Sequence, residues 1–360
     1  MGQLLKIKDL RTHFYSSGKT INALDGVSFE IEEGVTFGLV GESGCGKSVT
    51  ALSILQLIPD PPGKIIGGEI LFKGKDLLKL REKEIRSMRG KEISMIFQEP
   101  MTSLNPVFRI GQQVAEVIRL HQKVDRSESM RKAIEMLEKV HIPDALQVAD
   151  KIPHQKSGGM RQRVMIAMEL SCRPSLLIAD EPTTALDVTI QAQILRLLRE
   201  MQKELRTSIL LITHDLGVVA ELCDHVAVMY AGSIVEQSTV NQVFAGPKHP
   251  YTRGLWGAIP PVDEEKGTLS VIPGSVPDLS QLPTGCKFHP RCSFRFDPCD
   301  KINPPFIEAA PGHFVSCWLF ENDAAARMTT HIYEFVSTDA NPAVGCGLNN
   351  NREARERDNG

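Results

Sequence analysis

The sequence lacks any continuous apolar stretch of about 18 residues, the length that a membrane-spanning helix needs. Residues 1–9 lack the apolar core of a signal peptide, and Lys6 occupies the position where an N-myristoylation motif needs Ser or Thr. We also find no internal repeat and no coiled-coil pattern. These absences exclude a membrane-embedded chain and predict a cytosolic protein that reaches a membrane only through a partner.

The chain also has little excess charge, with 41 Lys and Arg against 44 Asp and Glu. This balance gives no global sign of nucleic-acid binding, so we expect no nucleic-acid partner. The hydrophobic content of 42% and the charged content of 24% are typical of globular proteins. At 360 residues the chain is longer than one average domain, which predicts two domains.

Cysteine is present but unevenly distributed. Four of the eight cysteines are scattered, and the other four lie in one segment, at Cys286, Cys292, Cys299 and Cys317. Because a cytosolic chain rarely uses structural disulfides, this local cluster indicates a metal site. Four thiolates suit either an iron–sulfur cluster or Zn²⁺, although the spacing lacks the C-x-x-C pairs of common zinc ribbons.

Apolar runs and turns predict an order of strands and helices along the chain. A small β layer is predicted from residues 4–14 and 27–31, and further short strands are expected at 68–72 and 92–97. Helical spacing then predicts helices over residues 111–120, 127–140 and 157–170, which together form a helical insertion from about residue 99 to 170.

The next segment predicts the core of an α/β fold. Strands are predicted at 176–179 and 208–213, with a helix at 189–205 between them. Such alternation implies a parallel sheet covered on both faces. A hairpin at 226–235, turning at Ala231-Gly232, closes this unit, and the chain then becomes rich in Pro and Gly.

The most informative stretch lies between a predicted strand at 35–40 and a predicted helix at 49–57. It fits G-x-x-x-x-G-K-[ST], in which glycines let successive backbone N–H groups point at one anion. We expect Lys47 to reach the β and γ phosphates of a nucleotide and Ser48 to ligate Mg²⁺, at the positive end of the helix dipole. The residues predicted to surround the phosphates are Gly41, Ser43, Gly44, Cys45, Gly46, Lys47, Ser48 and Val49.

Two adjacent carboxylates, Asp180 and Glu181, follow an apolar strand, where they are costly unless a cation meets them. We expect Asp180 to hold Mg²⁺ through its water shell and Glu181 to orient the water that attacks the γ phosphate. His214 and Gln98 also follow predicted strands, at the edge where open α/β sheets bind ligands. We expect His214 to contact the γ phosphate and Gln98 to sense Mg²⁺ or the attacking water.

A second anion-binding turn is predicted at Ser157, Gly158 and Gly159, directly before a helix. One nucleotide does not easily use two full cradles from one chain. The simplest resolution is a head-to-tail dimer, in which each such turn completes the site on the opposite subunit.

Together these motifs resemble the ATP-binding-cassette (ABC) ATPases over residues 1 to about 236. The matching segments are the phosphate loop GESGCGKS, the glutamine-loop residue Gln98, the signature SGGMRQ, the motif LLIADE, the D-loop at 184–187 and the switch residue His214. The resemblance implies an α/β fold with a parallel core sheet, an N-terminal antiparallel β layer and a helical insertion. It also implies that Asp187 lies near the nucleotide and that Phe14, or less readily Tyr15, stacks on adenine. Lys156 departs from the family, which usually has an apolar residue before the signature serine.

The C-terminal segment resembles the extension of oligopeptide and dipeptide importer ATPase subunits, which nickel-importer subunits share. The matching stretches are residues 249–255, 273–277 and 285–292. Subunits with this extension can hold a [4Fe–4S] cluster on four cysteines at these positions. We therefore favour the cluster over zinc or free thiols, as a structural clip. The predicted division is an ABC ATPase domain at 1–236, the extension at 237–320 and a disordered tail at 321–360.

The sequence is therefore interpreted as an ATPase subunit, bound to the cytoplasmic face of the cell membrane, that powers import of dipeptides or oligopeptides. The expected partners are a second ABC ATPase subunit (a heterodimer rather than a homodimer), two membrane-spanning permeases and, indirectly, an extracellular or periplasmic solute-binding protein. The alternatives are a nickel or other solute importer of the same family, a soluble ABC protein acting on DNA or ribosomes, and an iron–sulfur sensor.

Overall fold

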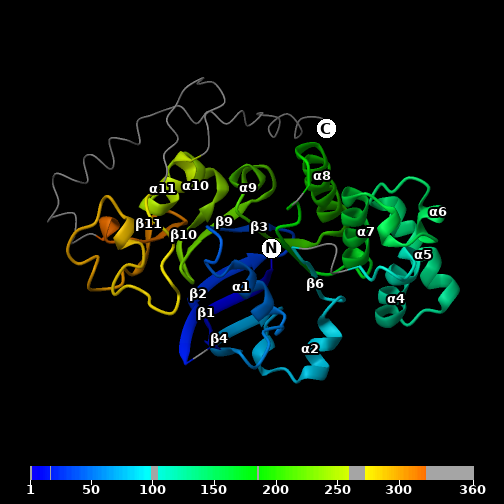
Figure 1. Ribbon diagram of the computed structural model, residues 1–360, viewed down its shortest axis with the longest axis horizontal. Coiled ribbons are helices and arrows are strands. Elements are labelled where there is room, and N and C mark those ends of the chain that lie inside the picture. Colours follow the sequence, from blue (N-terminus) through cyan, green and yellow to red (C-terminus); the bar gives the residue numbers. More distant parts are fainter. Residues whose placement is uncertain (1, 17, 99–103, 185, 259–271, 322–360) are drawn as a thin grey trace, which may run out of the picture.

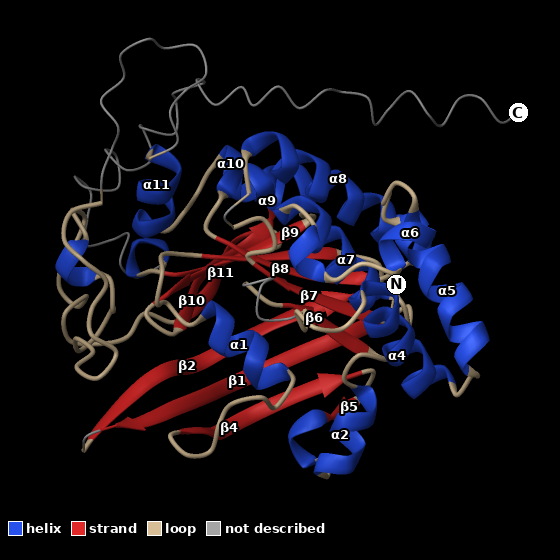
Figure 2. Cartoon of the chain, turned by 45° about the vertical axis from the view of Figure 1, so that its right-hand side comes forward, coloured by secondary structure: helices blue, strands red, loops and turns tan. Residues whose placement is uncertain are grey.

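The computed structural model describes residues 2–16, 18–98, 104–184, 186–258 and 272–321, which form two β-sheets and the helices packed on them. Figure 2 shows the larger sheet between a layer of helices and the smaller sheet, with α1 (Lys47–Ile54) lying between the two sheets. The α/β fold class predicted from the sequence is confirmed. The tail predicted at 321–360 lies, apart from its first residue, outside the described residues.

The smaller sheet is antiparallel throughout, in the order β2-β1-β4-β5. Its strands are β1 (Gln3–Ser16), β2 (Lys19–Glu32), β4 (Gly63–Phe72) and β5 (Lys75–Asp76). Leu5, Leu10 and Ile31 point into the core, and charged residues alternate with the buried ones along β1 and β2. This sheet is the predicted N-terminal antiparallel layer, and its strands extend beyond the predicted limits.

The larger sheet contains the predicted parallel core. Five of its neighbouring strands are parallel, in the order β9-β3-β8-β7-β6, and β10, β12 and β11 continue it as antiparallel strands. The strands are β3 (Thr36–Val40), β6 (Ile93–Ile96), β7 (Leu176–Asp180), β8 (Ser208–Thr213), β9 (His225–Tyr230), β10 (Ser233–Thr239), β11 (Phe306–Ala310) and β12 (His313–Ser316).

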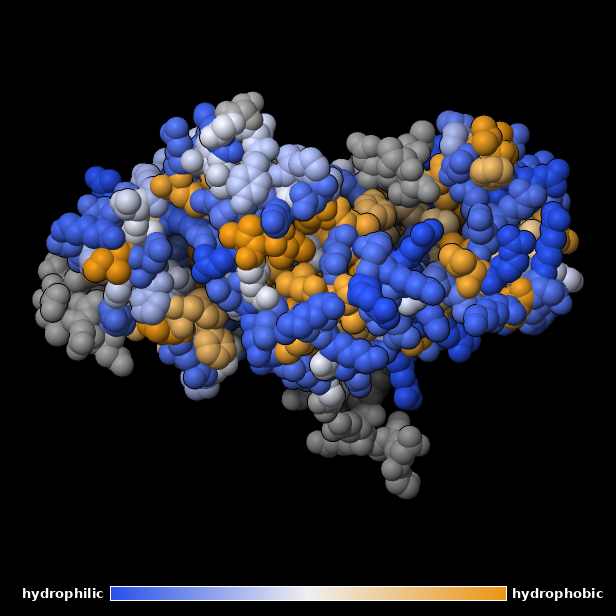
Figure 3. Space-filling model, turned by 90° about the horizontal axis from the view of Figure 1, so that it is seen from below, coloured by the Kyte–Doolittle hydropathy of each residue, from blue (hydrophilic) through white to orange (hydrophobic). Residues whose placement is uncertain are grey.

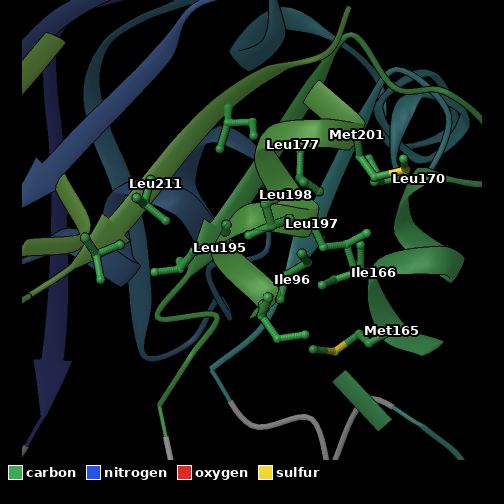
Figure 4. Packing of buried hydrophobic residues seen from close by; sticks show 14 of the residues in the cluster. Ile96, Met165, Ile166, Leu170, Leu177, Leu195, Leu197, Leu198, Met201 and Leu211 are labelled. Carbon is green, nitrogen blue, oxygen red and sulfur yellow. The ribbon is translucent and has the colours of Figure 1, made fainter. Parts of the chain in front are cut away.

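Successive residues of the parallel strands enter two different hydrophobic cores. Leu177 and Leu211 face the helices, whereas Ile178 and Leu210 face α1 and the smaller sheet. Both faces of the larger sheet are covered by other elements, so side chains on both faces are buried. This explains why the parallel strands are continuous apolar runs. Figure 4 shows the helix-side core, where labelled residues of the strands meet labelled leucines of α8 (Val188–Leu205).

The helices gather in two regions, as Figure 1 shows. A group formed by α4, α5, α6 and α7 lies at one end of the long axis, and its helices α4, α5 and α7 confirm the three helices predicted for the insertion. Five of the described helices were not predicted, because each spans eight residues or fewer: α2, α6, α9, α10 and α11. The remaining bounds are α2 (Glu82–Met88), α4 (Ile110–Gln122), α5 (Arg126–Lys139), α6 (Ala145–Ala149), α7 (Gly158–Leu170), α9 (Leu216–Leu222), α10 (Val240–Ala245) and α11 (Pro250–Gly257), with 3₁₀ turns at Leu77–Lys79, Pro153–Gln155, His289–Arg291 and Trp318–Phe320.

The C-terminal extension is continuous with the core sheet. The boundary predicted after Glu236 falls inside β10, because Glu236 and Gln237 pair with β12. The Glu236 carboxylate is fully buried and accepts hydrogen bonds from the backbone N–H groups of Lys248 and His249 and pairs with the His313 imidazole at 2.7 Å. This network joins β10, the start of α11 and β12, so strand pairing and buried hydrogen bonds hold the extension to the ATPase core.

Among the helices that the structure describes, none combines the length and the apolar composition that crossing a bilayer requires. Figure 3 shows one face of the molecule, on which hydrophilic residues cover most of the surface and hydrophobic residues form smaller groups among them.

Candidate nucleotide-binding and hydrolysis site

The phosphate-loop candidate connects β3 to α1 and needs glycine at specific positions. Gly41 and Gly46 have φ of +154° and +111°, a region that L side chains rarely adopt. A Cβ at Gly41 would lie 2.2 Å from the Met229 carbonyl oxygen, and one at Gly46 would lie 2.6 Å from the Ala23 carbonyl oxygen. The loop is therefore packed tightly against β9 and β2, and Ser43 and Gly44 form its exposed tip.

Lys47, the first residue of α1, curls back over this loop. Its Nζ donates hydrogen bonds to the Gly41 carbonyl at 2.8 Å and to the Glu42 carbonyl at 3.1 Å, and the residue is only 6% exposed. The buried Cys45 sulfur lies 3.9 Å from the same nitrogen. The positive charge is thus held against the loop, where it can meet an anionic ligand.

Asp180 ends β7 beside the start of α1. It is 4% exposed, and burial is the main reason that its pKa is raised, with the neighbouring Glu181 adding to the rise; a hydrogen bond with Ser48 and the charge of Lys47 oppose it. Within the described chain, Asp180 Oδ1 has no hydrogen-bond partner. A buried carboxylate oxygen without a partner, next to a serine hydroxyl, fits the oxygen ligands that Mg²⁺ prefers.

Glu181 collects the other predicted polar residues around its carboxylate. Gln98 Nε2 donates to Oε2 at 3.0 Å, Thr184 Oγ1 donates to the same oxygen at 2.9 Å, and His214 Nδ1 lies 3.1 Å from Oε1. Burial would raise the pKa of Glu181, but the hydrogen bonds from His214 and Thr184 outweigh it, and the pKa is lowered. The structure therefore brings Gln98, Glu181 and His214 together at one edge of the sheet and keeps the carboxylate ionised.

The second predicted anion cradle lies in a different part of the molecule. Ser157 caps α7 by accepting from the Met160 N–H, and Gly158 and Gly159 open the helix. Gly159 packs on α8, because a Cβ there would lie 2.7 Å from Ile190 Cγ2. Figure 1 shows α7 beside the α4–α6 group, displaced along the long axis from α1.

The contacts of four other residues singled out in the sequence, Lys156, Asp187, Phe14 and Tyr15, are made with neighbouring parts of the chain. The Lys156 carbonyl accepts from Arg161 Nη1 at 2.8 Å, so the turn before the signature is fastened through the main chain. Asp187 caps α8 by accepting from the Ile190 N–H. Phe14 lies on β1 against Gly63 of β4 and is partly buried, whereas Tyr15 is 50% exposed.

The four clustered cysteines line one cavity, together with aromatic and apolar side chains of the extension. All four are free, and burial raises the pKa of each thiol, to about 12 at Cys292. Across the described residues, no group of three or more Cys, His, Asp or Glu side chains stands close enough to form a single-ion metal site. The structure thus brings Cys286, Cys292, Cys299 and Cys317 to a shared space without forming a ligand set.

Two contacts at this site were not predicted from the sequence. Thr184 was identified only as part of the D-loop, and its hydroxyl reaches Glu181, three residues before it in the turn. Glu42, in the phosphate loop, forms a hydrogen-bonded ion pair with Arg291, which lies 249 residues further along the chain. No local pattern signals a pairing at that separation.

Comparison with known proteins shows which protein family the chain matches. The family model described as "ABC transporter" matches residues 24–184, and the one described as "Oligopeptide/dipeptide transporter, C-terminal region" matches residues 235–299. The chain is 53% identical to the probable peptide ABC transporter ATP-binding protein y4tR of Sinorhizobium fredii, over 88% of this chain and 94% of that protein. It is 50% identical to the oligopeptide transport ATP-binding protein AppD of Bacillus subtilis, over 91% of this chain and all of that protein.

Among solved structures, the chain is similar to the dimeric ATP-binding cassette MJ0796 bound to ADP and phosphate. The identity is 26% and the TM-score 0.59, covering 66% of this chain and 98% of that one.

The glycine loop after a buried parallel strand, with a carboxylate pair at the same sheet edge, defines a P-loop ATPase of the ATP-binding-cassette type. With relatives at this identity and coverage, the chain belongs to the ATP-binding subunits of ABC transporters, in the oligopeptide/dipeptide family.

Replacing Thr184 with Ala is expected to raise the pKa of Glu181, because the ionised carboxylate loses one hydrogen-bond donor. Carbon-13 NMR of labelled glutamate side chains, followed through an acid titration, measures that pKa. Thr184→Ser keeps the hydroxyl and is the matched control, expected to titrate as the unaltered chain does. An unchanged Glu181 titration in the Ala variant would show that the Thr184 contact does not stabilise the charge.

Proposed function

We propose that this ATPase powers the import of dipeptides or oligopeptides, as a peripheral subunit on the cytoplasmic face of a cell membrane. The observation that carries the substrate class is the match of residues 235–299 to the oligopeptide/dipeptide C-terminal region, in a chain about 50% identical to transport proteins described for peptides. A nickel importer of the same family is the second candidate.

The residues at the sheet edge divide the chemistry among them. Apart from the Glu42 N–H, which donates to Tyr251, the N–H groups of the loop from Gly41 to Val49 and the Lys47 ammonium bind the phosphates. Ser48 and Asp180 would hold Mg²⁺, with Gln98 nearby, and bound Mg²⁺ supplies neutralising charge at the phosphate oxygens. Glu181, kept ionised by its hydrogen bonds, orients and polarises the attacking water, and His214 contacts the γ phosphate.

A second ATPase subunit completes each site. The Ser157-Gly158-Gly159 turn belongs to the helical group set apart from α1, which supports a head-to-tail arrangement in which this turn serves the neighbour's nucleotide. Asp187, the last residue of the D-loop and the cap of α8, would lie near that subunit boundary. Similarity to a cassette described as dimeric supports the same arrangement, with either a different or an identical subunit as the partner.

ATP binding and hydrolysis would move the two ATPase subunits relative to each other, and the helical insertion would transmit this movement to two permease subunits. The proposed contact is the stretch 99–106 after Gln98, of which 99–103 lie outside the described residues. Val107 and Phe108, which follow it, are 74% and 55% exposed. Exposed apolar side chains beside the glutamine loop suit docking onto a membrane-spanning partner. A solute-binding protein outside the cell would deliver the peptide to those permeases.

Phe14 stacks on adenine in this proposal. It lies on β1 in the layer that flanks α1, and its ring packs against Gly63, so it is held in a defined orientation.

The extension would hold a [4Fe–4S] cluster on Cys286, Cys292, Cys299 and Cys317. In such a cluster each thiolate binds its own iron atom, so four thiols around a shared cavity fit it better than they fit one small ion. Bound there, the cluster would act as a structural clip for the extension, and it takes no part in ATP hydrolysis.

Glu181→Gln is expected to lower ATP turnover by about 100-fold or more, because the water loses its base, while ATP still binds. Lys47→Ala is the contrasting variant, expected to weaken ATP binding itself because the phosphates lose a buried positive charge. Hydrolysis by the assembled transporter and ATP titration measure the two effects separately. Turnover of Glu181→Gln within twofold of the unaltered protein would remove Glu181 from the proposed chemistry.

Deleting the gene is expected to abolish uptake of labelled dipeptides or oligopeptides by the cell and to leave nickel uptake unchanged. Restoring the unaltered chain should restore uptake, and restoring Glu181→Gln should not, although the subunit is present. Loss of nickel uptake with peptide uptake intact would favour the second candidate instead.

Anaerobically purified protein is expected to contain about four iron atoms and four sulfides per chain and to absorb broadly in the visible range. Cys292→Ser should lower the iron content, because it removes one cavity-lining thiolate. Cys172→Ser, which alters a cysteine outside the cavity, is the matched control and should keep it. Colourless protein with stoichiometric zinc would exclude the cluster in favour of zinc.

A further inference from the structure

The phosphate loop carries a carboxylate of its own, at Glu42. This side chain is 30% exposed and sits between Gly41 and Ser43, in the loop that is to bind a polyphosphate. An uncompensated negative charge there repels the ligand. The nearest cation of the loop, Lys47, is bonded to the Gly41 and Glu42 carbonyl oxygens.

The charge of Glu42 is met by the C-terminal extension. Arg291 Nη1 lies 2.7 Å from Oε2 and Nη2 lies 3.0 Å from Oε1, which is a two-bond pairing of guanidinium and carboxylate. The Arg291 side chain is only 6% exposed, and its Nε donates to the Pro273 carbonyl, which fixes the plane of the guanidinium. Because the Arg291 side chain is buried and held through three nitrogens, this ion pair is less weakened by solvent than a fully exposed pair.

The extension also holds the backbone of the loop. The Glu42 N–H donates to the hydroxyl of Tyr251, a fully buried residue of α11, at 2.9 Å. That N–H therefore points at the extension, and the side chain and the backbone of Glu42 are bound by two separate parts of it.

Arg291 and Tyr251 pack in an aromatic group, one member of which, Phe288, lines the cysteine cavity. The rings of Tyr230, Tyr251 and Phe288 lie 4.6–5.4 Å apart, and the Arg291 guanidinium lies 5.8 Å from the Tyr230 ring. Phe288 also lines the cavity, as do Cys286 and Cys292, which stand on either side of it in the chain. Continuous side-chain contacts thus link the cavity lining to the phosphate loop.

We propose that Arg291 and Tyr251 are positioning residues for ATP binding: they neutralise Glu42 and fix the phosphate loop in the shape that accepts the triphosphate. The C-terminal extension thereby sets the affinity of the ATPase core for nucleotide. The inference rests on the ATP-binding role of the loop, and it is independent of what the cysteine cavity holds, because every contact is made by the chain itself.

The test compares Arg291→Ala, Arg291→Lys, Tyr251→Phe and Glu42→Gln in the assembled transporter, with KM for ATP and kcat measured separately. Arg291→Ala should raise KM about tenfold and leave kcat within about twofold, because the residues around Glu181 are untouched. Arg291→Lys keeps the charge but loses the paired geometry, so its KM should be intermediate. Tyr251→Phe, which keeps the ring, should raise KM less than Arg291→Ala does.

The deciding variant combines Glu42→Gln with Arg291→Ala. If Arg291 acts by neutralising Glu42, removing that charge should recover a good part of the lost affinity. Lys301→Ala is the matched control: it breaks an exposed ion pair with Asp297 in the same extension and should leave KM unchanged. Thermal unfolding of each variant confirms that it is folded.

A KM of Arg291→Ala within twofold of the unaltered protein would overturn the proposal. So would a KM that stays high in the double variant, because Arg291 would then act only through its bond to Pro273. Failure of Arg291→Ala to fold would leave the decision to Tyr251→Phe, whose unchanged KM would overturn the proposal as well.

Discussion

The parallel hydrogen bonding of β3 between β8 and β9, with β7 beyond β8, is the constraint on which the rest of the structure depends. Because parallel neighbours end at the same edge, the phosphate loop after β3, the carboxylates at the end of β7 and His214 after β8 arrive side by side. The helices and the smaller sheet bury the two faces of this sheet, and that burial holds the strands in register.

The C-terminal extension depends on the same sheet. β12 adds to β10, and the buried Glu236 carboxylate ties that pair to the start of α11. Moving the extension would break these hydrogen bonds and leave buried polar groups without partners, which is costly, so the extension is held in one position relative to the core. From that position its arginine and tyrosine reach the phosphate loop, and the thiols gather around one cavity. The ATPase core and the extension therefore form one physical unit at this site.

Much of the site could be predicted, because its signals are local. A glycine turn before a helix, a carboxylate pair after an apolar run and a serine cap each involve residues within about ten positions, and backbone geometry over such distances follows from residue type. The continuous apolar runs of β3, β7 and β8 likewise predicted strands buried on both faces. The short helices α9 and α10 gave no such signal, since two turns carry too few residues to establish a period.

By itself, the sequence determined that the chain binds a nucleotide polyphosphate, where its loop begins and ends, and which side chains follow the strands. Only the tertiary structure decided that Glu181 is shared by Gln98, Thr184 and His214, that the extension joins the core sheet, and that Arg291 neutralises Glu42. The reason is physical: contacts between distant residues depend on how strands pair and cores pack, and these are properties of the whole chain rather than of any segment.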